Sequence, residues 1–380
     1  MRPVLRFKEF TDNWGMCKLS DVCDGFDYGI GASATDFNGV HKYIRITDID
    51  ENSHKYIGNP IVSPDCIPER RYLVNTNDIL FARTGASTGK TYLYDEKDSP
   101  LYFAGFLIRF NVSKANPSFI FYNTLTRNYN NWIKLTSARS GQPGINSEEL
   151  KNYSFQCPSI KEQTKIATFL NLYYKKIELQ KKKIEQLEKQ KQGVFNHFLN
   201  NLNNSHTYRV MDVFKITRGL VIPKSNLSLI KTDQYCYPTY SSQTSNNGLL
   251  GYSKTFLFDQ RCLTWTTDGA NAGKVFLRNG KFNCTNVCGV LLEKDEFNGY
   301  ANNFVEMLLN TLTPNHVSYV GNPKLMNNVM GSIKLTLPSL TEMKTYSNLL
   351  AKLTLKTQLE QQKLELLEKY KQGLLQKMFI

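Results

Sequence analysis

A long internal repeat constrains the fold of this chain more than any other sequence feature. Residues 158–199 and 338–379 align at an offset of 180 residues, and 14 of the 42 aligned positions are identical, including "LEKQKQG" over "LEKYKQG". Upstream of each segment a glycine-lysine turn also recurs, "RTGASTGK" at 83–90 and "TDGANAGK" at 267–274. A repeat of this kind indicates a chain built from two similar halves, each a variable block followed by a helical arm.

Each arm has the hydrophobic period of a long helix that packs along a partner. Apolar residues recur alternately three and four positions apart, which is typical of a coiled-coil seam. No further proline interrupts the arms, and Pro158 and Pro338 stand where helices would begin. The predicted seam positions are Leu170, Tyr173, Ile177, Ile184, Leu187, Val194, Leu350, Leu353, Leu364, Leu367 and Leu374. The polar interruptions of the seam coincide in the two arms: Gln180 with Glu360, and Lys191 with Lys371.

The connectivity favours an antiparallel pair of arms. The second variable block lies between them in the sequence, so two antiparallel helices of about 60 Å are the simplest arrangement. We therefore expect four segments: a recognition block at 1–157, an arm at 158–204, a second recognition block at 205–337 and a second arm at 338–380. Two ordinary amphipathic helices lying on separate cores are the alternative, but they would not explain the shared polar interruptions.

The pattern of both variable blocks predicts α+β domains with mostly antiparallel sheet. Short alternating runs such as "DILFART" and "KVFLRN" lie between turn residues, and each glycine-lysine turn sits between two such runs, as a hairpin loop would. Helices are expected around 117–131 and 300–311. The fold class is thus two pseudo-symmetric, mostly β domains separated by two long helices that form an antiparallel coiled coil.

The glycine-lysine turns do not fit a nucleotide-binding loop. The motif G-x-x-x-x-G-K-[ST] needs four residues between its glycines, and Gly85 and Gly89 enclose three. In the second copy, Val275 replaces the hydroxyl residue that would hold magnesium. We expect Gly85, Gly89, Gly269 and Gly273 to serve backbone conformations with positive φ.

No other catalytic pattern is visible. An N-P-P-Y motif, a glycine-rich cofactor strand and a cluster of acidic residues are all missing, and the eight cysteines form no C-x-x-C pair. The sequence therefore predicts reduced thiols, no metal site and no cofactor in this chain. No apolar run is long enough to span a bilayer and no secretory signal is visible, so a cytoplasmic location is expected.

The loops of both blocks carry aromatic and basic side chains suited to DNA. The formal net charge is +14, and a basic chain gains affinity for nucleic acid by releasing counterions from phosphates. Arginine pairs with guanine, asparagine and glutamine pair with adenine, and lysine mostly contacts phosphate. The candidate DNA contacts are Tyr28, Lys42, Arg45, Arg70, Arg71, Lys90, Arg139 and Gln142 in the first block and Arg218, Lys224, Tyr240, Ser241, Gln243, Lys274 and Lys324 in the second. For each of them an ordinary solvated surface position is the alternative.

The pattern resembles the specificity subunit of type I restriction–modification enzymes. The resemblance rests on the opening "LRFKEF", both glycine-lysine turns, "SGQPGIN", "PSIKEQTKIATFL" and the paired "LEKQKQG" and "LEKYKQGLLQKMF", and it covers nearly the whole chain. At the second junction, "VGNPKLM", Lys324 stands where the first has Gly144.

The resemblance implies a non-catalytic chain whose two domains each read one half of a split, asymmetric DNA site. It also implies that the arms dock modification subunits, two in the expected complex, that use S-adenosylmethionine. Restriction subunits that use ATP and Mg2+ would join them. A nucleotide hydrolase using "GASTGK", a coiled-coil adaptor that ignores DNA and a subunit of a different methyltransferase system remain the alternatives.

Overall fold

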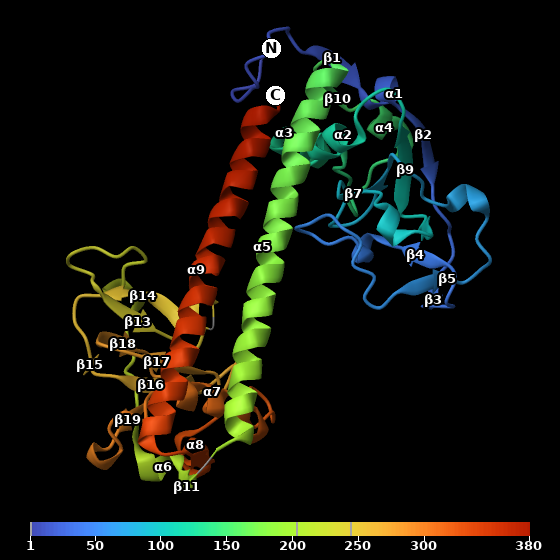
Figure 1. Cartoon of the computed structure of the whole chain (residues 1–380). Helices are drawn as coiled ribbons and strands as arrows, with labels where there is room; N and C mark the ends of the chain where they lie inside the picture. Colours follow the sequence, from blue (N-terminus) through green and yellow to red (C-terminus); the bar gives the residue numbers. More distant parts are fainter. Residues whose placement is uncertain (1, 203, 244) are drawn as a thin grey trace. The chain divides into compact units, whose positions relative to one another are not determined.

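The computed structural model describes residues 2–202, 204–243 and 245–380, and the chain forms two compact units (Figure 1). Unit 1 comprises Met1–Lys181 and Lys363–Ile380, and unit 2 comprises Lys182–Gln362. Two long helices, α5 (Ile160–Asn200) and α9 (Leu340–Met378), contribute residues to both units. The α+β fold class expected from the sequence is confirmed.

Unit 1 is built on an antiparallel four-stranded sheet in the order β2-β9-β6-β7. Its strands are β1 (Gly15–Lys18), β2 (Cys23–Tyr28), β3 (Ala34–Asp36), β4 (Lys42–Ile44), β5 (Val62–Pro64), β6 (Asp78–Ala82), β7 (Thr91–Leu93), β8 (Leu101–Phe103), β9 (Leu107–Val112) and β10 (Ser154–Cys157). Its short helices are α1 (Leu19–Val22), α2 (Pro117–Asn123), α3 (Arg127–Thr136) and α4 (Ser147–Lys151). All five residues of β6, "DILFA", are buried, as expected for a central strand covered on both faces.

Unit 1 also has the two-stranded sheets β3-β5 and β4-β8, whereas unit 2 repeats the four-stranded sheet as β12-β19-β16-β17 and has a second four-stranded sheet, β14-β13-β18-β15. Its strands are β11 (His206–Arg209), β12 (Phe214–Arg218), β13 (Tyr237–Tyr240), β14 (Leu249–Ser253), β15 (Phe258–Asp259), β16 (Cys262–Thr266), β17 (Val275–Arg278), β18 (Lys281–Cys284), β19 (Cys288–Glu293) and β20 (Lys334–Leu337). Its short helices are α6 (Val210–Val213), α7 (Asn303–Leu312) and α8 (Asn327–Ser332). In both units an antiparallel pair joins the first and last strands of the block, β1 with β10 and β11 with β20.

The helix expected around 117–131 is two helices. α2 ends at Asn123, and α3 starts at Arg127 after Thr126, whose hydroxyl accepts a hydrogen bond from Tyr129 N. A threonine in this position ends one helix and caps the next, because its side chain replaces a missing backbone partner. The single helix expected around 300–311 is present as α7, which is capped by Asn302.

The long helices pack antiparallel within each unit. In unit 1 the first turns of α5 lie beside the last turns of α9: Leu170 shares a core with Leu375 and Met378. In unit 2, Lys183 on α5 pairs with Glu360 on α9 at 2.5 Å. Of the predicted seam residues, Leu170, Ile177, Leu187, Leu350, Leu364 and Leu367 are buried, and Tyr173, Ile184, Val194, Leu353 and Leu374 are half-buried.

Candidate nucleic-acid interface

The glycine-lysine turns are the loops of two matching hairpins. In unit 1 the turn joins β6 to β7 and closes with a 2.8 Å hydrogen bond from Gly89 N to Ala82 O. In unit 2 it joins β16 to β17, and Gly273 N donates to Thr266 O at the same distance. The four turn glycines have φ between 80° and 96°, as expected from the sequence. The conserved spacing is therefore explained by turn geometry.

A second loop packs against each turn through the same backbone contacts. In unit 1, Gly85 N donates to Pro143 O at 3.0 Å, and Ile145 N donates to Arg83 O at 2.9 Å. In unit 2 the corresponding hydrogen bonds join Gly269 N to Pro323 O and Leu325 N to Thr267 O, both at 2.9 Å. Lys324 in place of Gly144 thus leaves the backbone of the junction unchanged, because only its side chain is added to the surface.

The turn, its partner loop and the adjoining strand ends form a surface that we call the loop face. In unit 1 the Arg83 guanidinium lies over the Tyr28 ring at 4.9 Å and over the Phe106 ring at 5.9 Å. The Tyr28 hydroxyl accepts a 3.0 Å hydrogen bond from Ser147 N at the start of α4. Gln142 is exposed and lies next to the turn. This face presents an arginine, two aromatic rings and an amide to solvent.

The loop face of unit 2 has the same backbone and different side chains. The 3.0 Å bond from Arg83 N to Phe106 O corresponds to a bond of the same length from Thr267 N to Val287 O. At the position of Tyr28, Arg218 donates a 2.9 Å hydrogen bond to Asn327 Oδ1 at the start of α8. The side chains of this face are those of Arg218, Val287, Asn322, Lys324 and Asn327, because Thr267, the counterpart of Arg83, is buried and its hydroxyl donates to Asp268 Oδ2 at 2.6 Å. Two faces of one architecture therefore carry different hydrogen-bonding groups.

Several candidate residues of unit 1 are held by the protein itself. Lys42 Nζ donates to two backbone oxygens at 3.2 Å, and Arg45 binds Asp48 through two nitrogens at 2.9 Å. Arg71 and Arg139 form ion pairs with glutamates at 3.0 and 2.6 Å, but both side chains remain exposed. Arg70 is exposed in a short loop helix.

Lys90, which could contact phosphate or cap the hairpin, is held inside the protein. Its side chain is 6% exposed, and Nζ donates to Ile49 O at 2.8 Å and to Glu51 Oε1 at 2.6 Å. An external phosphate cannot reach this ammonium group unless the covering loop moves. Lys274, its counterpart in unit 2, is exposed. The same motif position therefore has two different environments.

The remaining candidates of unit 2 fall into two groups. Lys224 is exposed in a loop. Tyr240 is half-buried under the Arg278 guanidinium, 3.5 Å from its ring centre. Ser241 accepts a 3.1 Å hydrogen bond from Thr285, and Gln243 donates its amide to Leu249 O. These polar groups thus stabilise the second sheet and its loops.

The sequence analysis missed Arg83, Phe106, Asn322 and Asn327 on the loop faces. Arg83 directly follows a buried strand and Phe106 lies within the apolar run 101–108, so neither position indicates a surface residue. The position of Arg83 and Phe106 was a usable signal. Arg83 begins the turn between β6 and β7, and Phe106 immediately precedes β9, where loop side chains reach the surface.

The described residues show no sign of metal or thiol chemistry. No cluster of metal-ligating side chains occurs among them, and their eight cysteines are free. Burial raises the pKa of Cys23 and Cys262 to about 12, which keeps these thiols protonated and unreactive. None of the helices in the described ranges is long and apolar enough to cross a membrane.

Comparison with known proteins connects this architecture to a family. Residues 11–189 and 203–369 match the protein-family model for the "Type I restriction modification DNA specificity domain". A putative type I specificity subunit of Mycoplasma pneumoniae, S.MpnORF289P N-terminus, is 43% identical over 135 residues, which is 35% of this chain and 69% of the relative. Another from the same organism, S.MpnORF365P, is 35% identical over 210 residues, covering 52% of this chain and 74% of the relative.

Solved structures have the same fold. The S subunit of a type I restriction–modification system from M. genitalium matches with a TM-score of 0.66 at 16% identity, covering 100% of this chain and 99% of that one. A chain from a study of complex assembly and conformational transition in a type I system matches with a TM-score of 0.54 at 13% identity, covering 97% and 98%.

Proposed function

Because the chain belongs to the family of type I restriction–modification DNA specificity domains, we propose that it reads a two-part DNA site, one part with the loop face of each unit. The chain is a specificity subunit, which is the non-catalytic member of its complex and acts together with DNA and other subunits. We assign the two readers to recognition blocks 1–157 and 205–337. Acting on the cell's DNA would place it in the cytoplasm.

One observation carries the proposal: the two loop faces share backbone contacts but differ in side chains. Tyr28 and Phe106 in unit 1 correspond to Arg218 and Val287 in unit 2, whereas Arg83 corresponds to Thr267, whose side chain is buried and leaves no exposed group at that place. Side chains at the same place on the same frame would meet DNA in the same way and read different bases. The two parts of the site should therefore differ in sequence.

The chemistry of the two faces suits base reading. An arginine pairs bidentately with guanine and an amide with adenine, and each good pair contributes about 1–3 kcal/mol of discrimination. The exposed aromatic rings can stack on bases or contact thymine methyl groups. The net charge of +14 supplies the affinity for phosphate that positions these groups without reading sequence.

The test exchanges side chains between the faces. In the complex with modification subunits, the double variant Arg83→Thr and Phe106→Val should alter the bases methylated in one part of the site and leave the other part unchanged. Lys134→Ala is the matched control, because it also removes one positive charge, from an exposed residue of α3 that belongs to neither long helix. Sequencing of methylated genomic DNA measures both parts. Unchanged specificity, or affinity lost equally for all sequences, would count against the proposal.

We further propose that the long helices dock the modification subunits. Their outer surfaces carry large apolar residues in contact with solvent, with exposed fractions of 56% for Leu179 and 56% for Leu359, which occupy the same position of the repeat. Leu172 is also exposed on α5, seven residues before Leu179, and Leu366 is exposed on α9, seven residues after Leu359, so each helix carries its own pair of exposed leucines. Apolar residues in a helical stripe typically mark a protein interface.

Replacing these leucines tests the docking surface. Leu179→Glu and Leu359→Glu should each weaken copurification of the modification subunit. Leu135→Glu is the control, because Leu135 is 81% exposed but lies on α3, away from both long helices in the sequence. Full binding by both helix variants would contradict the docking proposal and leave DNA reading untouched.

A further inference from the structure

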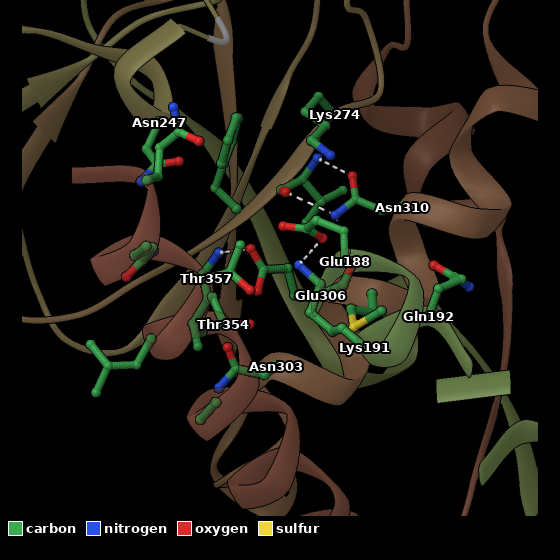
Figure 2. Close-up of a pocket in the computed structure, with 18 of the residues that line it drawn as sticks. Glu188, Lys191, Gln192, Asn247, Lys274, Asn303, Glu306, Asn310, Thr354 and Thr357 are labelled. Carbon is green, nitrogen blue, oxygen red and sulfur yellow. Dashed lines mark hydrogen bonds and ion pairs between the residues drawn. The ribbon is translucent and has the colours of Figure 1, made fainter. Parts of the chain in front are cut away.

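Unit 2 contains a polar cleft that the recognition function does not use. Its volume is about 770 Å³, and it lies between β17 and α7 on one side and the unit 2 residues of α5 and α9 on the other (Figure 2). Figure 2 shows Lys274, Asn303, Glu306, Asn310, Thr354 and Thr357 around it. A cavity of this size accommodates a short segment of chain or a small molecule.

In unit 1 the corresponding place is filled by residues 50–56, which we call the filling turn. Lys55 Nζ lies 2.5 Å from Glu178 Oε2 on α5. The His54 ring donates through Nδ1 to Thr91 O on β7 at 2.9 Å, and it packs edge-on against Phe121 of α2 at 6.1 Å. The turn thus touches a strand, a short helix and a long helix at once.

The surfaces that hold the filling turn all have counterparts in the cleft of unit 2. β7 corresponds to β17, because each follows the glycine-lysine turn. α2 corresponds to α7: Thr124 is bonded to the first residue of β7, and Asn310 to the first residue of β17. Glu178 corresponds through the repeat to Gln358, which lines the cleft. The receiving surface is therefore repeated, and among the described residues of unit 2 no segment occupies it as the filling turn does in unit 1.

The cleft has an excess of positive charge, because Lys191, Lys274 and Arg278 line it with only two carboxylates, Glu188 and Glu306. In unit 1, Glu51 of the filling turn pairs with Lys90 at 2.6 Å. Lys274, the counterpart of Lys90, makes no ion pair in the part of the chain that the structure describes. Arg278 is buried: its guanidinium donates to Thr264 Oγ1 at 3.1 Å and to Asn247 O at 2.8 Å and lies over the Tyr240 ring, with Glu306 as the carboxylate that interacts with its charge.

The two acidic groups of the cleft offset these three cations only in part. Glu188 is engaged by Lys191 at 2.7 Å. Glu306 accepts a 3.0 Å hydrogen bond from Leu277 N, and burial raises its pKa, which disfavours its charged form. Lys274, which has no ion pair among the described residues, therefore leaves an excess positive charge that favours the entry of an anionic group.

We propose that this cleft receives an acidic turn of the modification subunit, in the place that residues 50–56 fill in unit 1. The inference rests on the proposed function, which supplies this partner. A DNA duplex is too wide for the cleft, whereas a turn of a few residues fits, as the filling turn does. A carboxylate from the partner would pair with Lys274 as Glu51 pairs with Lys90. The two docking sites on this chain are then unequal, one filled by the chain itself and one open.

The experiment measures the two binding steps of the modification subunit from the same system on the full chain, by titration calorimetry and native mass spectrometry. Lys274→Glu reverses the charge at the cleft, and Thr354→Trp fills it. Each should weaken one of the two binding steps about tenfold or more and leave the other unchanged. Lys334→Glu is the matched control, because Lys334 is exposed on β20 outside the cleft and makes the same charge change.

The possible outcomes separate the inference from the proposed function. Two unchanged binding steps in both variants would overturn the inference alone. A Lys274→Glu variant that binds both subunits normally but binds DNA less tightly would also overturn it, since the lysine would then contact phosphate. A native chain that binds no modification subunit would overturn both. Thermal unfolding of Thr354→Trp controls for folding, and Lys274→Glu changes an exposed side chain and does not depend on that control.

Discussion

Arg6 and Glu162 form a buried ion pair in unit 1. Replacing Glu162 tests whether burial increases the loss of unfolding free energy when an ion pair is broken. The Arg6 guanidinium donates two hydrogen bonds of 2.7 Å to the Glu162 carboxylate. The side chains are only 11% and 2% exposed. Glu342 occupies the same position of the repeat in α9, where it accepts a 2.8 Å hydrogen bond from Ser339 Oγ at the exposed start of the helix.

We expect Glu162→Gln to lower the free energy of unfolding of unit 1 by about 3–5 kcal/mol, because it leaves the Arg6 charge buried without a counterion. Glu342→Gln should cost about 1 kcal/mol or less, the value of a helix cap at the surface. For a unit of roughly 200 residues, where each kcal/mol shifts the melting temperature by about 2–4 °C, the Glu162 variant should melt about 6–20 °C lower.

Calorimetry of the full chain measures the shift, and hydrogen exchange read by mass spectrometry shows which unit has loosened. The double variant Arg6→Met and Glu162→Met serves as the control, because removing both charges should restore most of the stability. Similar losses for Glu162→Gln and Glu342→Gln, or a loss below about 1 kcal/mol for the first, would refute the reasoning that burial decides the cost.

Three further predictions concern single residues. Burial lowers the pKa of His54, so unit 1 should lose stability as pH falls below the unfolded-state pKa of about 6.5. Amide hydrogen exchange in residues 50–56, corrected for its intrinsic rate, should therefore accelerate between pH 7.5 and 5.5 in the native chain. The His54→Gln variant should show no such acceleration. Gly89→Ala should destabilise unit 1 by about 3 kcal/mol in urea unfolding, because φ is 94° and the new methyl group would lie 2.8 Å from Ile133. Gly269 has a φ of 96°, but no atom lies close to the place of the new methyl group, so Gly269→Ala should cost only about 1–2 kcal/mol. Burial raises the pKa of Glu306, so unit 2 should lose stability as pH rises above the unfolded-state pKa of about 4.3. Glu306→Gln should remove this pH dependence of stability and raise the midpoint of urea unfolding at pH 7.

The long helices could be predicted from sequence because their signal is local and repeated. A three-four spacing of apolar residues is visible in each arm without knowing its partner, and Pro158 and Pro338 precede the observed starts of α5 and α9 by two residues. The turn glycines were predictable for the same reason, since their positive φ depends on the hairpin itself. The division of 117–131 into two helices depended on one capping threonine, which a hydrophobic pattern does not register.

The loop faces and the cleft could be predicted only in part, because they depend on contacts between distant segments. Lys90 and Lys274 occupy the same position of the same motif, and the sequence gives no reason to separate them. Their environments differ because residues 50–56 fold over the first lysine, whereas no segment within the described ranges covers the second. A motif fixes the backbone of a turn, whereas the rest of the chain decides whether its side chain is buried, reads DNA or meets a partner. The filling turn is therefore the feature that makes the two halves unequal, and it should determine which half requires a segment from outside.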